Sequence, residues 1–278
     1  MPISPPMRFL SAAVLAFGLA GFLGGCSSTK DKDKDAYQER PVEELYNSAM
    51  NSLSRSEYKT AAKEFDEVER QHPYSVWATK AQLMAAYAQY QNSKFDEAIM
   101  ALDRFIQLHP GHRDIAYAYY LKALCYYEQI ADVSRDQKIT GQALDSLQEV
   151  VRRFPGTKYA LDASMKIDLT RDHLAGKEMA IGRYYQNQQQ YTAAINRYRT
   201  VLDDYQTTTH VPEAMHRMIE CYEALGLEDA AKKTAAVLGY NYPGNIWYED
   251  SYTLVTGEKA DPPYGKKGSS WLGWIGLE

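Results

Sequence analysis

The sequence has few of the residues from which enzyme sites are built. Its 278 residues include only six histidines and three cysteines, and no two histidines stand at the spacing of a zinc-binding HExxH helix. A glycine-rich phosphate loop and the nucleophile elbow of serine hydrolases are also missing. We therefore expect a protein that is not an enzyme and that holds no metal ion.

A basic stripe is absent as well. Lys and Arg number 31 against 36 Asp and Glu, which gives a formal net charge of −5, and the basic residues are scattered. Such a chain is a poor binder of nucleic acid, so no nucleic-acid partner is expected. Phenylalanine is scarce, with seven residues against 23 tyrosines. Because a tyrosine ring has an apolar body and a polar end, it suits a groove as well as a core.

The apolar run near the N-terminus is too short to span a bilayer. It extends from Phe9 to Leu23, follows Arg8, and has the layout of a signal-peptide core. It ends in Leu23-Gly24-Gly25-Cys26, which resembles the lipobox of bacterial lipoproteins. We therefore expect residues 1–25 to be removed as a lipoprotein signal peptide. The alternative is an ordinary secretory signal followed by a chance cysteine.

In a lipoprotein, Cys26 becomes the mature N-terminus and carries S-diacylglycerol and an N-acyl chain such as palmitate. Several acyl chains give near-permanent anchoring, because each buried methylene contributes about 0.8 kcal/mol. Ser27, rather than Asp, follows the cysteine. In the lipoproteins that this resembles, such a residue permits export to the outer membrane. Residues 26–41 are charged and poor in apolar side chains, so a flexible tether is expected after the lipid.

Five copies of one pattern occupy residues 42–243. Aligned on a small residue in the second helix of each copy, they carry Ala61, Ala98, Ala143, Ala194 and Ala231. The same face four residues later carries Phe65, Leu102, Leu147, Tyr198 and Ala235. Twelve residues after the alanine stand Pro73, Pro110, Pro155, Gln206 and Pro243. Twelve residues before it, four copies have a small or compact residue: Ala49, Ala86, Gly182 and Ile219. This spacing is typical of tetratricopeptide repeats and predicts an all-α superhelix of five helix pairs.

Two copies are longer than the others. The third has eight inserted residues around 131–137, between its two helices, which predicts a loop. The fourth has 14 extra residues between Pro155 and Gly182, which predicts one first helix lengthened by about four turns. Residues 244–278 form a C-terminal extension without the repeat pattern. Its apolar residues Trp271, Leu272, Trp274, Ile275 and Leu277 indicate either a docking motif or a floppy tail.

The two cysteines within the repeats are expected to be unpaired. Cys125 and Cys221 both fall in first helices, but two repeats apart. Their α-carbons should therefore be separated by more than the roughly 7 Å that a disulfide can bridge. Each is interpreted as a small buried hydrophobe.

Tyrosines mark one flank of the first helices. In the third copy, Ala116, Tyr119, Ala123 and Tyr126 follow the spacing of packing within the repeat. The opposite flank carries Tyr117, Tyr120, Leu121, Leu124 and Tyr127 at i, i+3, i+4, i+7 and i+10. A helix that is apolar on both flanks needs two burial partners, and a ligand can be one of them. In the bland alternative, these tyrosines only pack between neighbouring first helices.

Taken together, these features resemble the BamD family, the lipoproteins of the outer-membrane β-barrel assembly machinery. The likeness covers residues 26–255 and is clearest in YAYYLKALCYYEQIADVSRDQ from Tyr117 and YYQNQQQYTAAINRYRTVLDDYQ from Tyr184. Gln206, where the other copies have proline, is a small departure. The resemblance implies a non-catalytic scaffold that is lipid-anchored at the periplasmic face of the outer membrane.

The resemblance also implies partners. In the family, the C-terminal repeats bind the POTRA domains of BamA, smaller lipoproteins of the Bam complex attach, and the N-terminal repeats receive the C-terminal segments of unfolded outer-membrane proteins. We predict that an extended peptide ending in an aromatic residue binds a tyrosine groove formed by Tyr46, Tyr87, Tyr90, Tyr117, Tyr120 and Tyr127. An alternative function is that of another periplasmic tetratricopeptide scaffold, one that coordinates peptidoglycan synthesis with envelope constriction.

The pair Asn196-Arg197 is the predicted partner contact. The helical spacing predicts that Arg197 points away from the packing stripe of its helix. The alternative is that Arg197 is an ordinary solvated arginine without a partner protein. The resemblance implies that this pair contacts an acidic residue on the last POTRA domain of BamA. A guanidinium can hold a carboxylate with two parallel hydrogen bonds, which lysine cannot do.

Overall fold

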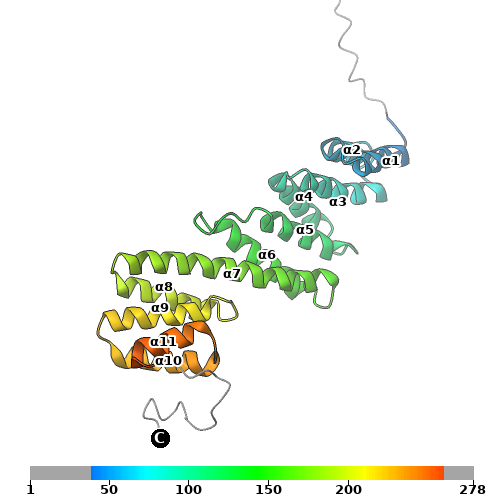
Figure 1. Cartoon of the computed structure of the whole chain (residues 1–278). Helices are drawn as coiled ribbons and strands as arrows, with labels where there is room; N and C mark the ends of the chain where they lie inside the picture. Colours follow the sequence, from blue (N-terminus) through cyan, green and yellow to red (C-terminus); the bar gives the residue numbers. More distant parts are fainter. Residues whose placement is uncertain (1–38, 260–278) are drawn as a thin grey trace, which may run out of the picture. The chain divides into compact units, whose positions relative to one another are not determined.

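The computed structural model describes residues 39–259, and these form eleven α-helices and no strand (Figure 1). The helices are α1 (Val42–Ser54), α2 (Tyr58–Gln71), α3 (Val76–Gln91), α4 (Phe95–Leu108), α5 (Ile115–Tyr127), α6 (Lys138–Arg153), α7 (Lys158–Asn187), α8 (Tyr191–Asp204), α9 (Val211–Ala224), α10 (Glu228–Asn241) and α11 (Ile246–Thr256). The predicted signal peptide, Cys26, most of the tether and Trp271–Leu277 lie outside the described residues.

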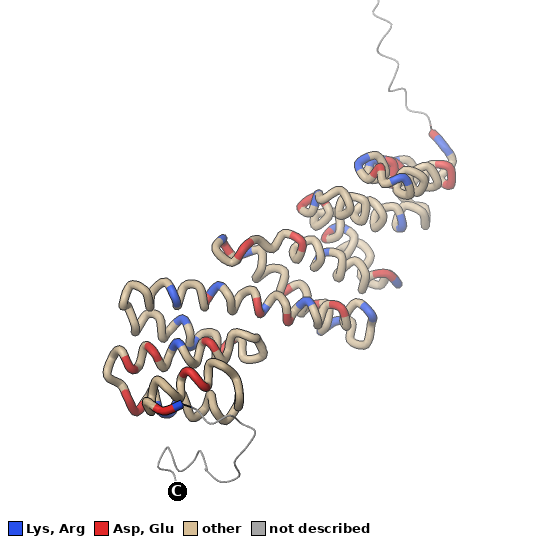
Figure 2. Tube along the Cα trace, in the orientation of Figure 1, with Lys and Arg blue, Asp and Glu red and all other residues tan. Residues whose placement is uncertain are grey.

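Helices α1 to α10 form five consecutive pairs. Each helix packs against the one before it and the one after it, and the first helices α1, α3, α5 and α7 also touch in sequence. The predicted all-α tetratricopeptide fold is therefore confirmed. Lys and Arg are interspersed with Asp and Glu along the described chain and do not gather in one stripe (Figure 2). No helix of the described residues combines the length and the apolar character that crossing a membrane requires.

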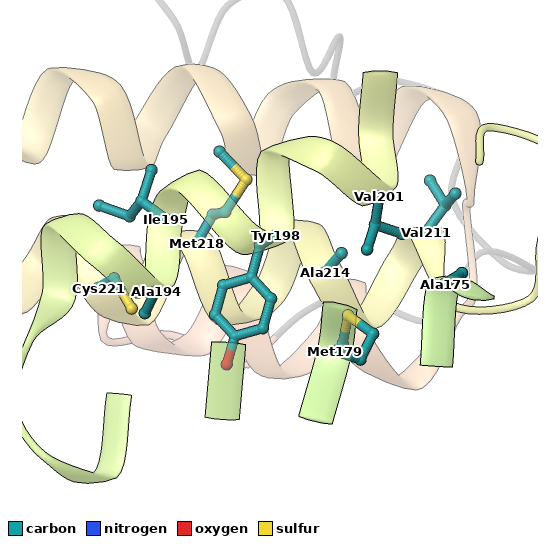
Figure 3. Close-up of a cluster of buried hydrophobic side chains, with 10 residues drawn as sticks. All are labelled: Ala175, Met179, Ala194, Ile195, Tyr198, Val201, Val211, Ala214, Met218 and Cys221. Carbon is teal, nitrogen blue, oxygen red and sulfur yellow. The ribbon is translucent and has the colours of Figure 1, made fainter. Parts of the chain in front are cut away.

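The small residues of the repeat pattern lie where the two helices of a pair meet. Ala61, Ala98, Ala143, Ala194 and Ala231 are all fully buried. The side chains four residues later, from Phe65 to Ala235, are also buried, each with at most 1% of its surface exposed. Figure 3 shows one such core, to which α8 contributes Tyr198 and Val201 and α7 contributes Ala175 and Met179.

The turns between paired helices share a backbone conformation. Ser56, Ser93, Gln189 and Gly226, each five residues before the repeat alanine, have φ of 61°, 57°, 59° and 70°. This is the left-handed region, which normally favours glycine. In two of the turns between pairs, a side chain caps the following helix. Ser75 caps α3 by accepting a hydrogen bond from the backbone N–H of Ala78, and Thr157 caps α7 by accepting one from the backbone N–H of Ala160.

Both predicted length changes are found. Helix α7 has 30 residues, and residues 128–137 form the loop between α5 and α6. The loop packs against the second half of α7, where Lys177 Nζ donates to the carbonyl oxygens of Ser134 and Arg135 at 3.2 and 3.3 Å. The long helix and the inserted loop are thus one structural feature.

Helix α11 was not anticipated from the sequence. It lies in the C-terminal extension and packs against α9 and α10. The ring of Tyr248 sits so close to Gly239 of α10 that a Cβ at position 239 would overlap it. At the other end of the described chain, Arg40 is also held: its backbone N–H donates to Gln71 Oε1 at 2.9 Å. Cys125 and Cys221 are buried and unpaired, as predicted.

Candidate binding surfaces

Five tyrosines from three first helices form what we call the tyrosine cluster: Tyr87 and Tyr90 of α3, Tyr117 and Tyr120 of α5, and Tyr159 of α7. The ring centroid of Tyr159 lies 5.6 Å from that of Tyr117 and 5.3 Å from that of Tyr120. Tyr117 is also close enough to Tyr87 and Tyr90 to interact with them electrostatically. All five side chains are half-buried, so each presents part of its surface to solvent.

Three phenols of this cluster, those of Tyr90, Tyr117 and Tyr120, have raised pKa values and stay protonated. Burial, with a smaller contribution from the neighbouring Glu128 carboxylate, raises the pKa of Tyr90 to about 12. Burial likewise raises the pKa of Tyr117 and Tyr120, and a hydrogen bond of 2.5 Å from the Tyr120 hydroxyl to Asp162 Oδ2 adds to the rise at Tyr120. The cluster therefore offers neutral aromatic faces and hydroxyl donors, bordered by two carboxylates.

The other two predicted groove tyrosines lie elsewhere. Tyr127 lies beneath Lys166 of α7, whose Nζ is 4.8 Å from the ring centroid. Tyr46 packs against Phe65 and Trp77, with ring centroids 5.5 and 4.8 Å away, in a different core cluster. The structure thus brings together four of the six predicted residues in the tyrosine cluster. Tyr127 is outside the cluster but packs on the same core as Tyr120 and Tyr159, whereas Tyr46 belongs to a different core.

One further residue of the predicted flank is placed differently. Leu121 is 1% exposed and belongs to the core shared with α3 and α4, so it lines no groove. Conversely, Tyr159 was not assigned to the groove. Tyr159 stands four residues before Ala163 in the lengthened first helix, a spacing that indicates a helix but not a ring that faces the tyrosines of α5.

A second surface lies on α8. Ala194, Ile195, Tyr198 and Val201 form a stripe of α8 that is buried in a core with residues of α7 and α9 (Figure 3). Asn196 and Arg197 lie off this stripe and are exposed. They line a shallow depression of about 420 Å³ together with Tyr185, Gln190, Ala193 and Thr200. The outward orientation predicted for Arg197 is therefore confirmed.

Arg197 also has a partner that its sequence context did not indicate. Its Nη1 donates to Glu178 Oε2 of α7 at 3.2 Å, while 44% of the arginine side chain stays exposed. An exposed pair of this kind contributes little to stability, typically below about 1 kcal/mol. It does orient the guanidinium at the rim of the depression.

Charged and polar side chains join the C-terminal part of α7 to α9. Arg183 Nη1 donates to Glu213 Oε1 at 2.9 Å, and Glu220 accepts from Arg217 and Gln186, both at 2.9 Å. Burial raises the pKa of Glu220, but hydrogen bonds from His216, Gln186 and Arg217 outweigh it and hold the pKa at about 2. The carboxylate is thus ionised at neutral pH and ties the fourth repeat to the fifth. Within the described residues, no group of His, Cys, Asp and Glu is placed to hold a metal ion.

Fold and surfaces together define a tetratricopeptide-repeat protein with an aromatic surface and a polar depression. The family YfiO, described as an outer membrane lipoprotein, matches residues 38–238. The outer membrane protein assembly factor BamD of Caulobacter vibrioides is 50% identical over 244 residues, which cover 88% of this chain and 79% of that protein. BamD of Rickettsia prowazekii is 49% identical, covering 88% of this chain and 96% of that protein. The chain therefore belongs to this family of outer membrane lipoproteins.

Solved structures that resemble the chain include the tetratricopeptide domain of P58(IPK), with a TM-score of 0.40 and 15% identity, covering 77% of this chain and 55% of that one. A thermophilic tetratricopeptide protein of Thermus thermophilus aligns with a TM-score of 0.36 and 16% identity, covering 77% of this chain and 98% of the other.

Proposed function

We propose that this chain is a non-catalytic scaffold of outer-membrane β-barrel assembly, and that its tyrosine cluster receives the C-terminal segment of an unfolded outer-membrane protein. The observation that carries this proposal is the convergence of five half-exposed tyrosines from α3, α5 and α7 on one surface. The names of the relatives support the role in assembly and do not favour the alternative of peptidoglycan coordination.

The chemistry of the cluster suits an extended peptide with an aromatic end. Aromatic pairs contribute about 0.5–1.5 kcal/mol beyond the area they bury, and a strand presents alternate side chains to one surface. The hydroxyl of Tyr120 donates to Asp162 Oδ2 at 2.5 Å, which fixes the orientation of this ring before a ligand arrives. Preorganisation of this kind lowers the entropy lost on binding.

The depression at Asn196 and Arg197 is the proposed contact for the POTRA region of BamA. Glu178 holds one side of the guanidinium, and a carboxylate from the partner would take the exposed side. The smaller lipoproteins of the Bam complex would bind other faces of the same repeats. In this arrangement one rigid array of helices presents substrate and barrel subunit to each other.

The anchor is proposed to be the lipid on Cys26, which would hold the protein at the periplasmic face of the outer membrane. The lipobox-like sequence and the membership of a lipoprotein family support this. Cys26→Ala should leave a soluble or inner-membrane precursor, because no acyl chain can be attached. Density-gradient fractionation of cells that lack BamA would detect this. Flotation of the variant with outer membranes in those cells would contradict the proposed anchor.

The substrate site can be tested by titrating a fluorescent peptide, taken from the C-terminus of an outer-membrane β-barrel, against the purified chain. Tyr87→Ala with Tyr120→Ala should weaken binding about tenfold or more, because two ring faces are lost. Tyr74→Ala is the matched control, since Tyr74 is fully exposed at the turn before α3 and should leave affinity unchanged. Equal affinity for the peptide and its scrambled version would refute the site.

A further inference from the structure

The first half of α7 carries an apolar stripe that no other described residue covers. Leu161, Met165 and Leu169 stand four residues apart, so they share one face of the helix. Their exposed fractions are 70, 57 and 61%. Isolated apolar residues are normal on a protein surface, whereas a contiguous row marks an interaction site. We call these three residues the α7 stripe.

The α7 stripe is exposed because α8 and α9, which cover the second half of α7, do not extend over its first half. Leu161 and Met179 are 18 residues apart, which is five full turns, so both point to the same side of the helix. Met179 is completely buried against α8, whereas Leu161 is exposed. The turn before α9 reaches back only to Asp172, whose Oδ1 accepts from the N–H and hydroxyl of Thr209 at 3.1 and 2.8 Å. The lengthened part of α7 therefore extends beyond its covering helices.

A groove between α6 and α7 borders the stripe. One depression of about 480 Å³ is lined by Val151, Pro155, Ala160, Leu161 and Ser164. A second, of about 390 Å³, adjoins it at Val151 and Ser164 and includes Arg152, Arg171 and one carboxylate, Asp168. Within the described part of the chain, neither of these arginines forms an ion pair. The surface thus combines an apolar floor with two arginines and one aspartate at one end, which leaves a net positive charge there.

We propose that the chain's own C-terminal segment, Trp271–Leu277, docks on the α7 stripe. Five of its seven residues are apolar, two of them tryptophan, and Glu278 follows with the charge that Arg152 and Arg171 would attract. Packing tryptophan rings on leucine and methionine removes apolar surface of both from water, which favours the contact. The residues between, 260–270, are polar apart from Tyr264 and short alanine and proline steps, as expected of a linker.

The linker is long enough for this contact. The 12 steps from Lys259 to Trp271 span up to about 40 Å when extended. Helix α11 packs on α9, and the turn before α9 contacts Asp172, so the sideways separation is about two helix spacings of 8–10 Å. Between Lys259 and the stripe, the offset along the helix axes is at most about 30 Å, taken from the rise of 1.5 Å per residue. Combined at right angles with the sideways separation, this gives a distance of roughly 35 Å, which is shorter than the extended linker. Tethering at this distance produces an effective concentration near millimolar, so a weak contact suffices.

The test compares crosslinking rates in the full mature chain carrying Cys26→Ser. Met165→Cys paired with Ile275→Cys is treated with a short bismaleimide, and the intramolecular product is followed by its gel mobility. Met100→Cys paired with Ile275→Cys is the matched control, because Met100 is 65% exposed on α4. Cys125 and Cys221 are buried, with pKa values raised to about 12 and 11, so they react slowly.

We expect the Met165→Cys pair to crosslink at least tenfold faster than the control, and Leu161→Asp with Leu169→Asp to abolish this advantage. Equal rates for the two pairs would overturn the proposal. So would an unchanged advantage in the aspartate variant, because the contact would then not involve the stripe. A tryptophan emission shift that requires vesicles of phosphatidylethanolamine and phosphatidylglycerol, together with equal crosslinking rates, would assign the segment to the membrane surface instead.

Discussion

At the residue scale, each helix pair has one position on its first helix and one on its second that share a core, and where one of the two residues is small the other is larger. The first helix contributes Ala49, Ala86, Ala123, Gly182 or Ile219, and the second contributes Phe65, Leu102, Leu147, Tyr198 or Ala235. The smallest residue, Gly182, faces the largest, Tyr198, whereas Ile219 faces an alanine. Because protein interiors are close-packed, the repeat conserves the volume of the pair and not the identity of either residue.

This account predicts that Gly182→Ala destabilises the protein by about 1–3 kcal/mol, although alanine is the better helix former. A Cβ at position 182 would lie 2.8 Å from Cδ1 and Cζ of Tyr198, and closer still to Cε1. Gly141→Ala in α6 is the control: no atom lies within 4 Å of the added Cβ, so stability should rise by up to about 1 kcal/mol.

Urea denaturation measures both variants, and a second substitution tests the cause. Tyr198→Leu in the Gly182→Ala background should recover part of the loss, so the double variant should be more stable than the sum of the single effects. Strict additivity of the two substitutions would show that the glycine and the tyrosine do not oppose each other.

At the scale of helices and turns, one backbone conformation recurs in four of the five described intra-repeat turns. The left-handed position is glycine only at Gly226 and is otherwise Ser56, Ser93 or Gln189. A left-handed residue with a side chain costs roughly 1–2 kcal/mol, whereas glycine loses more chain entropy on folding. The third repeat lacks this constraint because residues 128–137 replace its short turn with a loop.

Gln189→Gly should therefore stabilise the protein by about 0.5–1 kcal/mol, because the φ of 59° suits glycine better. Thermal or urea unfolding measures the change. Gly226→Gln, at the equivalent position of the fifth repeat, should lose stability by a similar amount. The neighbouring Gln188 has φ of −85°, so Gln188→Gly should also lose stability. Stabilisation by both glycine variants in the fourth repeat would argue against a role for the left-handed angle.

Sequence spacing predicted the helix pairs, the loop of the third repeat and the length of α7, because each depends on positions counted along the chain. Helix α11 was not predicted because its packing depends on one close approach, Gly239 against Tyr248, that no repeat pattern marks. Tyr159 and Glu178 were missed for a related reason. Their partners, Tyr120 and Arg197, lie on other helices, and side-chain pairs between helices are fixed by the packing of the repeats.

At the scale of the whole molecule, the described repeats divide into two chemical regions. The tyrosine cluster lies on α3, α5 and the beginning of α7, and the polar depression lies on α8 with the end of α7. Helix α7 contributes Tyr159 to the first surface and Tyr185 to the second, 26 residues away. A single helix, about 39 Å long over this interval at 1.5 Å per residue, thus fixes the distance between the proposed substrate and BamA sites.

The central claim is that this chain joins BamA to substrate, and a titration of the last POTRA domains of BamA tests it most directly. Wild type should bind, and Arg197→Ala should lose about 2–5 kcal/mol of binding energy if the ion pair is desolvated in the complex. Arg197→Lys should also bind poorly, because an ammonium cannot donate two parallel hydrogen bonds to one carboxylate. Arg199→Ala, exposed on the same helix, should bind as wild type does. Affinities within twofold for all four proteins would contradict the proposed contact.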